Sequence, residues 1–332
     1  MNRAQLIKTI QRIMPGTDSS GSSLGQSECI VFKEGMAYSF NDQIAIRAEV
    51  EVPFEGAVEA SKLLQALQTQ SSDEVKMTVK DEKVVIKSGK RKCTLALNQK
   101  IELPISIIEL PRKWRPVSDD FVEAIGTAAR TAGRDENKYT LTCVHIAPDR
   151  LEATDNIQLL RWPTATGVRK STLISGRTAT ILQKYNVTES GLTDQWSHFR
   201  DDTSLVYSVR VHEDEYPDMT DYYEVEGSPV VFPPDIGEVA SRASSFLESA
   251  KEDGIMVQLE EGRMFVVGEG STAVYEERTR VDYDGPTIAF HINPGICQKL
   301  SKEATETIIS ADRIKVITEK YEYVAVLQKV KG

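Results

Sequence analysis

The chain has few of the residues from which disulfide frameworks and metal sites are built. Its 332 residues include only four cysteines and four histidines. No two cysteines form a CxxC pair, and no His or Cys spacing is typical of a zinc site. We expect reduced thiols at Cys29, Cys93, Cys143 and Cys297. The sequence therefore predicts no disulfide framework, no metal and no other cofactor.

Long apolar runs are also missing. None approaches the roughly 20 residues that a membrane span requires. Residues 1–14 mix basic and apolar side chains and contain no apolar core of a secretory signal. We therefore expect a cytoplasmic protein with no membrane partner.

Sequence signatures of catalysis are equally scarce. The chain contains no GxSxG motif and no metal constellation, and its acidic run at 213–215 is expected to be solvated surface. The segment at 15–27 resembles a phosphate loop only superficially, because no Lys precedes Ser22. We expect a flexible surface loop there, and we do not expect an enzyme.

Charge is unevenly distributed along an acidic chain. Asp and Glu number 50 against 40 Lys and Arg, which gives a net charge of −10. Taken as a whole, this balance argues against a protein that grips nucleic acid by bulk electrostatics. The position of the basic residues therefore matters more than their total.

Three segments of the chain share one order of predicted elements. Each begins with an amphipathic helix, and each contains a second, shorter helix, as the apolar period of 3.6 residues indicates. The opening helices are predicted at 2–14, 119–134 and 234–251, and the second helices at 60–70, 176–186 and 293–303. Leu6 and Val122 hold equivalent positions in the first two segments and are 116 residues apart.

Between the two helices of each segment the pattern predicts strands and tight turns. First strands are expected at 28–32, 140–146 and 254–259, and second strands at 36–40, 150–153 and 263–267. The turns that follow contain the turn formers Asn41-Asp42, Asp155-Asn156 and Gly268-Glu269-Gly270. Closing antiparallel strands are expected at 75–80, 84–97, 205–211, 308–310 and 314–327.

The repeat predicts three homologous α+β domains, in which two helices pack on antiparallel sheets. The expected boundaries are 1–116, 117–225 and 226–332. The linkers fall at 110–118 and 222–234, where Pro111, Pro116, Pro229, Pro233 and Pro234 end the preceding strands.

Four stretches in this order resemble the sliding clamp family of bacteria and phages, the DNA polymerase III beta subunits, in a divergent form. The stretches are 151–159 with its Ala-Thr-Asp turn, 215–219 with Tyr216-Pro217-Asp218, 288–293 and 321–327. Together they extend the resemblance over nearly the whole chain. It implies a closed ring, formed by two three-domain chains that pair head to tail.

The resemblance also implies a function and partners. A ring of this family encircles double-stranded DNA without reading its sequence and tethers the replicative polymerase as a processivity factor. Polymerase and clamp loader bind it through short peptide motifs. The expected place of action is the cytoplasm, at the nucleoid of a bacterial or phage-infected cell.

The six predicted helices are the basic part of the acidic chain. They carry +5 over 80 residues, so the remaining residues carry −15. Long cationic side chains on a helix face can meet phosphates without reading bases. The spacing of Arg130, Arg134 and Lys138, at i, i+4 and i+8, predicts such a face. The predicted DNA-facing residues are Lys8, Arg12, Lys62, Arg130, Arg134, Lys138, Tyr139, Arg177, Lys184, Arg242, Lys299 and Lys302.

The resemblance further implies a peptide pocket between the second and third domains. Its predicted residues are Leu141, Thr154, Asn156, Ile157, Gln158, Leu159, Pro217, Val324, Val326 and Leu327. Most are apolar or small, as such a pocket requires. Two departures stand out, because Asn156-Ile157-Gln158 replaces the Gly-His-Arg of the family and Val326-Leu327-Gln328 replaces Met-Pro-Met. The pocket is therefore expected either to prefer a different peptide or to be degraded.

A second hypothesis remains open at this point. The chain could be a clamp-like scaffold or regulator that binds peptide motifs but does not encircle DNA. Ring closure between the first and third domains distinguishes the two hypotheses, since only a processivity factor depends on it.

Overall fold

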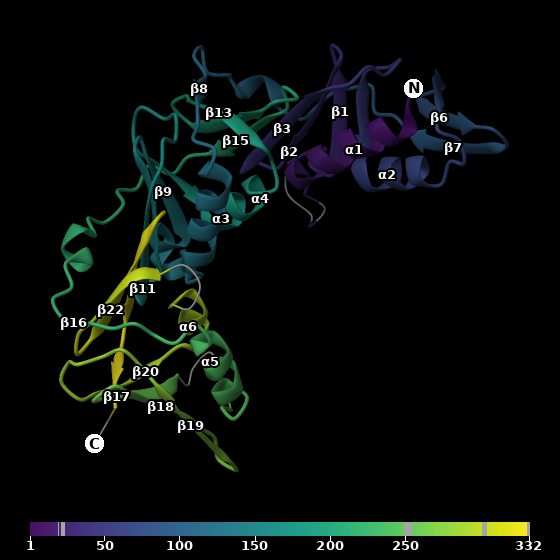
Figure 1. The fold of residues 1–332 in the computed structure, drawn as a ribbon. Helices are drawn as coiled ribbons and strands as arrows, with labels where there is room; N and C mark the ends of the chain where they lie inside the picture. Colours follow the sequence, from purple (N-terminus) through teal and green to yellow (C-terminus); the bar gives the residue numbers. More distant parts are fainter. Residues whose placement is uncertain (19, 21–23, 249–253, 301–303, 331–332) are drawn as a thin grey trace. The chain divides into compact units, whose positions relative to one another are not determined.

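The computed structural model describes residues 1–18, 20, 24–248, 254–300 and 304–330. Helices alternate with short antiparallel strands along the chain (Figure 1). Two compact units are present: unit 1 contains residues 1–130, 144–149 and 164–214, and unit 2 contains 131–143, 150–163 and 215–332. Both units take part of residues 117–225, so the division into three domains stays a prediction.

The helices of unit 1 bury the apolar faces that the sequence predicts. They are α1 (Arg3–Ile13), α2 (Ala60–Gln68), α3 (Phe121–Thr131, ending at the unit boundary) and α4 (Gly176–Leu182). In α1, the side chain of Asn2 accepts a hydrogen bond from the Gln5 N–H and caps the first turn. Leu6, Ile10 and Ile13 lie one helical turn apart and are buried.

One eight-stranded antiparallel sheet dominates unit 1, in the order β4-β1-β2-β3-β15-β14-β13-β8. Its strands are β1 (Cys29–Lys33), β2 (Met36–Phe40), β3 (Ile44–Glu49), β4 (Gly56–Glu59), β8 (Arg115–Pro116), β13 (Val187–Leu192), β14 (Trp196–Asp201) and β15 (Val206–Arg210). β3 belongs to the first predicted domain and β15 to the second, and the two strands pair directly. We call this pairing the first junction.

Smaller groups of strands complete unit 1. A three-stranded sheet contains β5 (Lys76–Lys80), β6 (Lys83–Ser88) and β7 (Arg91–Ala96), with β7 at one edge. β12 (Thr172–Ser175) lies beside β9 (Cys143–Ala147).

Unit 2 repeats the same arrangement. β10 (Arg150–Thr154) and β11 (Gln158–Pro163) continue into β23 (Glu322–Val326), β22 (Arg313–Thr318), β21 (Ala304–Ile309) and β16 (Ser228–Pro229), in that order. β11 of the second predicted domain thus pairs with β23 of the third, and we call this pairing the second junction.

A separate five-stranded sheet of unit 2 has the order β19-β18-β17-β20-β24. Its strands are β17 (Ile255–Glu260), β18 (Arg263–Glu269), β19 (Val274–Arg280), β20 (Ile288–Ile292) and β24 (Gln328–Lys329). The helices α5 (Ile236–Ser244) and α6 (Pro294–Leu300) pack against each other. Strand β19 is an edge of this sheet.

Two predicted turns are confirmed and one is wrong. Asp42 and Asn156 adopt left-handed backbone conformations with φ of 71° and 76°, which short polar side chains tolerate. β18, in contrast, continues through Gly268 to Glu269, and the turn comes later, where the Gly270 N–H donates to the Ala273 carbonyl.

Several predicted elements end earlier than their apolar patterns suggest. α3 ends at Thr131 instead of residue 134, because the Gly133 N–H bonds to the carbonyls of Leu141 and Thr154. A 3-10 helix, η3 (Glu136–Thr142), occupies the start of the strand predicted at 140–146. α4 and α5 are also shorter than predicted. Parts of the predicted helices at 234–251 and 293–303, and of the loop at 15–27, lie outside the described residues.

The four cysteines are free thiols, of which Cys29, Cys143 and Cys297 are buried. Burial raises the pKa of the Cys29 thiol to about 12. Among the described helices, none is long and apolar enough to cross a membrane.

His198 gives unit 1 a testable pH dependence. The ring is fully buried on β14, and its two nitrogens bond to Ser208 Oγ at 2.8 Å and Thr193 Oγ1 at 3.1 Å. Burial, with a further contribution from the Arg47 charge, lowers the His198 pKa to about 3. The unfolded chain therefore binds an extra proton between about pH 6.5 and 3, so stability falls with decreasing pH in this window by up to about 1.4 kcal/mol per unit. In urea titrations from pH 7 to 4, His198→Gln is expected to remove this part of the slope, and an unchanged slope would contradict it.

Candidate functional site

Most of the predicted DNA-facing side chains of unit 1 lie on the solvent side of their helices. Lys8 on α1 and Lys62 on α2 are exposed, and the two helices pack together through their opposite faces. Arg177 on α4 and Lys184 just after it are exposed as well. Among the described residues, Lys8, Lys62 and Lys184 form no ion pair, so their charges are available to a polyanion.

Arg130 lies at the end of α3 and contacts the next helix. Its guanidinium donates to Thr127 Oγ1 at 3.0 Å and reaches Gln183 Oε1 at 3.5 Å, and it remains exposed. The latter contact joins α3 to the residue that caps the end of α4. These hydrogen bonds orient the side chain without neutralising its charge.

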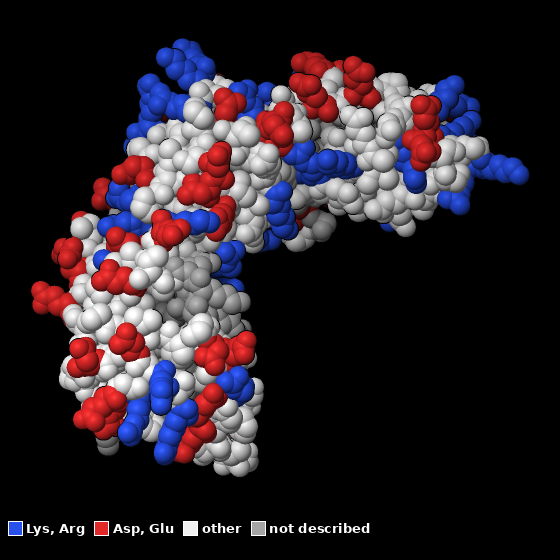
Figure 2. All heavy atoms as spheres, in the orientation of Figure 1, with Lys and Arg blue, Asp and Glu red and all other residues white. Residues whose placement is uncertain are grey.

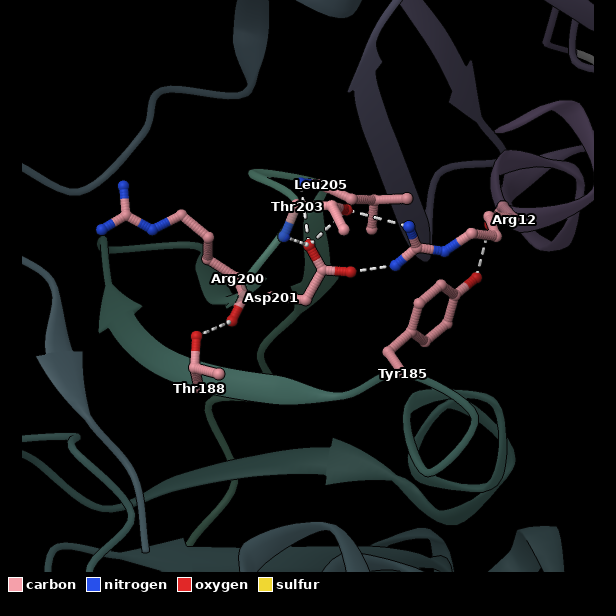
Figure 3. Close-up of polar contacts among 7 residues, drawn as sticks. All are labelled: Arg12, Tyr185, Thr188, Arg200, Asp201, Thr203 and Leu205. Carbon is pink, nitrogen blue, oxygen red and sulfur yellow. Dashed lines mark hydrogen bonds and ion pairs between the residues drawn. The ribbon is translucent and has the colours of Figure 1, made fainter. Parts of the chain in front are cut away.

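Arg12 differs from the rest of the predicted set, because its charge is matched within the chain. Figure 3 shows its guanidinium directed at Asp201, with which it forms an ion pair, and at Thr203. The Tyr185 hydroxyl donates to the Arg12 carbonyl at 2.6 Å. Asp201 is buried and also accepts from the backbone N–H groups of Thr203 and Leu205. This network links α1 to β14.

The predicted set in unit 2 is less uniform. Arg134 and Lys138 are exposed but do not continue a helix, so the expectation of an i, i+4, i+8 face is wrong; Lys138 has non-helical backbone angles. Tyr139 is exposed beside them. Arg242 on α5 forms a two-point contact with Glu277 on β19, which lowers the pKa of that carboxyl. The side chain of Lys299 and the whole of Lys302 lie outside the described residues.

The face drawn in Figure 2 has no continuous area of either sign. Lys and Arg side chains are interspersed with Asp and Glu.

The residues of the predicted peptide pocket converge on the second junction. Leu159 and Val324 are directly opposite each other across β11 and β23, and both are buried. Tyr223, Met219 and Val225 from the linker pack over this pair. Thr154 is buried, Leu141 is half-buried and Pro217 is exposed.

A tight turn fixes the chain beside this pair. The Asp155 carboxylate accepts hydrogen bonds from the backbone N–H groups of Ile157 and Gln158, both at 2.9 Å. Thr154 Oγ1 donates to the Gln158 carbonyl, and the Tyr323 hydroxyl donates to Gln158 Oε1. The replacement of Gly-His-Arg by Asn156-Ile157-Gln158 is thus accommodated by a fully bonded turn.

Two apolar side chains remain exposed at the rim. Ile157 is 53% exposed and Val326 is 42% exposed, and the Val326 N–H donates to the Ile157 carbonyl at 2.8 Å. Leu327, also predicted for the pocket, is buried and contributes to the core instead of the rim. Adjacent exposed apolar groups beside a buried apolar pair are suited to bind an apolar peptide side chain.

Sequence reasoning missed two residues of this site. Tyr223 is buried against Leu159 and Val324, and Arg161 stacks over the Tyr223 ring with its guanidinium carbon 4.1 Å from the centroid. The Nε of Arg161 also donates to Glu152 Oε1 at 2.8 Å. The alternation of β11 predicts which face Arg161 occupies, but nothing local predicts that the linker returns to cover it.

No protein-family model and no curated protein sequence matches the chain. Solved structures do. A DNA polymerase sliding clamp from Pseudomonas aeruginosa is 16% identical, with a TM-score of 0.85 over 99% of both chains. The DNA polymerase III beta subunit of Thermotoga maritima is 15% identical, with a TM-score of 0.82 over 100% of this chain and 99% of the other. The sliding clamp of Bartonella birtlesii, solved with griselimycin bound, is 16% identical, with a TM-score of 0.85 over 99% and 98%. The resemblance predicted from the sequence is therefore confirmed at the level of the fold: this chain has the sliding-clamp fold of the DNA polymerase III beta subunits.

Proposed function

We propose that two copies of the chain close head to tail into a ring around duplex DNA and tether a replicative polymerase without catalysing a reaction. Polymerase and clamp loader would bind through short peptides at the second junction. The place of action would be the cytoplasm, at the nucleoid. The three predicted domains, 1–116, 117–225 and 226–332, would be the repeating units of the ring.

The observation that carries the proposal is the repetition of one strand pairing. At the first junction the third strand of one predicted domain, β3, pairs with the last strand of the next, β15. At the second junction the third strand, β11, pairs with β23, which only the two-residue strand β24 follows in the last domain. The third strand of the last domain is β19, and β7 is the strand of the first domain that only the two-residue strand β8 follows. Both β19 and β7 are sheet edges.

Pairing β7 of one chain with β19 of another would repeat the junction and leave neither edge open. Both strands carry exposed side chains along most of their length. Edge strands are otherwise a risk for uncontrolled association. Applied twice, a head-to-tail contact of this kind gives a closed dimer.

The test is retention on DNA of different topology. The purified protein is loaded on nicked circular and on linear duplex of equal length, and its loss is followed by gel filtration at high salt. A ring is expected to remain on circles and to leave linear DNA through the ends. Equal loss from both would contradict encirclement and favour a clamp-like scaffold that only binds peptides.

The exposed helix lysines are expected to set the salt dependence of DNA binding. Replacing Lys8, Lys62 and Lys184 together by Ala should reduce the slope of log affinity against log salt, by roughly 0.9 for each phosphate that is no longer neutralised. The matched control replaces the exposed strand residues Lys76, Lys80 and Lys83 by Ala, with the same change in net charge. Fluorescence anisotropy on labelled duplex between 50 and 200 mM salt measures both, and equal slopes would contradict a DNA-facing role for the helices.

The exposed rim of the second junction is expected to bind griselimycin, the compound found in the similar Bartonella birtlesii structure. Ile157→Asp and Val326→Asp should each weaken binding about tenfold, because a carboxylate replaces apolar contact area. The control is Val79→Asp, since Val79 is similarly exposed at 39% but lies in unit 1. Isothermal titration calorimetry measures the three affinities, and equal weakening by Val79→Asp would rule out a site at the rim.

A further inference from the structure

The first and second junctions can be compared position by position through their strand registers. In the second, Leu159 faces Val324. In the first, the corresponding pair is Ala45 and Ser208. The small pair therefore occupies the place where the second junction has two larger apolar side chains.

Small side chains at the first junction leave a cavity of about 170 Å³. Ala45 and Ser208 form part of its wall on the sheet, and Ile105, Ser106 and Ile108, just before the first linker, form another part. A 3-10 helix lies at this point in both connecting segments: η2 (Ile105–Ile107) precedes the first linker, and η4 (Thr220–Tyr223) leads into the second. In the second junction η4 supplies the Tyr223 ring that packs on the cross-strand pair.

Arg47 lines the cavity at the first junction, and it lacks the acidic cross-strand neighbours that Arg161 has at the equivalent position of the second junction. Arg161 at the second junction has Glu152 opposite it on one strand and Glu322 opposite it on the other. Arg47, at the same register position of the first junction, has Tyr38 and Val206. Within the described part of the chain the buried Nε of Arg47 has no hydrogen-bond partner, and the other charged residues of the cavity wall are Lys33 and Glu34, one of each sign. A buried guanidinium nitrogen without an acceptor is costly, so an anionic group that reached it would be bound favourably.

The residues around the cavity also favour an anionic ligand. Leu110 lines the small cavity and also a wider one of about 860 Å³. Four cationic side chains, against the two carboxylates of Glu109 and Asp194, line the wider cavity: Arg112, Lys113, Arg115 and Arg169. In a chain of net charge −10, this is a local excess of positive charge. A ligand that leaves the small cavity along Leu110 would meet basic side chains.

We propose that the first junction is a second peptide-binding site, which takes an acidic segment of a partner protein. One apolar side chain of the segment fills the space between the Ala45–Ser208 pair and η2, and a neighbouring carboxylate accepts hydrogen bonds from Arg47. Further acidic residues lie along the basic wall beyond Leu110. The site is distinct from the second junction and does not depend on ring closure or on DNA.

The probe is a short fluorescein-labelled peptide with one Phe flanked by Asp and Glu residues. In the control peptide each Asp is replaced by Asn and each Glu by Gln. Fluorescence polarisation with the full chain is expected to show binding of the acidic peptide and at least tenfold weaker binding of the amide version. Ala45→Leu, which narrows the cavity, and Arg47→Gln are each expected to weaken the acidic peptide at least tenfold.

Two further variants make the result decisive. Ser106 is exposed, so Ser106→Tyr can cover the cavity as Tyr223 covers the second junction without disturbing the sheet; it too should abolish binding. Leu159→Ala alters only the second junction and should leave the affinity unchanged. Thermal melting checks that each variant is folded. The proposal is overturned if Ser106→Tyr and Arg47→Gln bind like the wild type, or if Leu159→Ala alone removes binding.

Discussion

Replacing Lys92 by Glu is expected to convert the proposed dimer of two 37.0 kDa chains into monomers. Lys92 is an exposed residue of the edge strand β7. We carry the register of the two internal junctions over to a β7–β19 contact. Each position is counted from the turn that connects its strand to the preceding strand, β6 for β7 and β18 for β19. This count places Lys92 opposite Glu276 or Glu277. Glu277 is already bound by Arg242, whereas Glu276 forms no ion pair with any described residue, so we take Glu276 as the partner. The substitution therefore replaces attraction by repulsion at each interface.

Like charges directly opposite in an antiparallel pair are destabilising. A loss of about 1.4 kcal/mol per interface is tenfold in affinity, and a closed dimer has two interfaces, so the dissociation constant should rise about 100-fold. Light scattering over a concentration series measures it. Lys83→Glu on the inner strand β6 changes the same charge at a position opposite Ala96 instead of Lys92, and should leave the dimer intact. Adding Glu276→Lys to Lys92→Glu should restore dimerisation, and if it does not, the proposed register is wrong.

Local features of the fold could be predicted because they depend on short-range physics. The burial of Leu6, Ile10 and Ile13 follows from helical spacing, and the left-handed conformations of Asp42 and Asn156 follow from the side chains that tolerate them. The repeat also predicted the order of elements, and the sliding-clamp fold agrees with it.

Features that depend on long-range pairing could not be predicted. Strands β13 and β14 were not predicted because they bury polar residues, among them Ser190 and His198, which are hydrogen-bonded to Thr166 and to Ser208 on the next strand. The pairing of β3 with β15, and hence the contrast between Arg47 and Arg161, depends on a register between strands about 160 residues apart. A buried polar residue finds its hydrogen-bond partners only in the folded chain. It therefore interrupts the apolar periodicity from which a strand is predicted.

The second large effect is expected from Asp201→Ala. Its carboxylate is almost fully buried and receives the Arg12 guanidinium, the Thr203 hydroxyl and N–H, and the Leu205 N–H at 3.0 Å (Figure 3). The Arg12 side chain is 26% exposed and can be solvated when its partner is removed, so the main loss is that of hydrogen bonds to a charged group, about 1.5–3 kcal/mol. The Leu205 N–H also loses its acceptor. We expect a loss of stability of this size in urea denaturation of the full chain.

The neighbouring residue provides a matched control. Asp202 is exposed, so Asp202→Ala removes the same charge from the same turn and should change stability by less than about 1 kcal/mol. Thr203→Val, which keeps the carboxylate but removes one donor, should fall between the two. Arg12 belongs to α1 of the first predicted domain, whereas Asp201 belongs to β14 of the second. Their contact therefore fastens the opening helix to the sheet that both domains share. If Asp201→Ala were no more destabilising than Asp202→Ala, the network would not contribute measurably to stability. The Arg12 charge would then be available to DNA, as the sequence predicts for the other residues of that set.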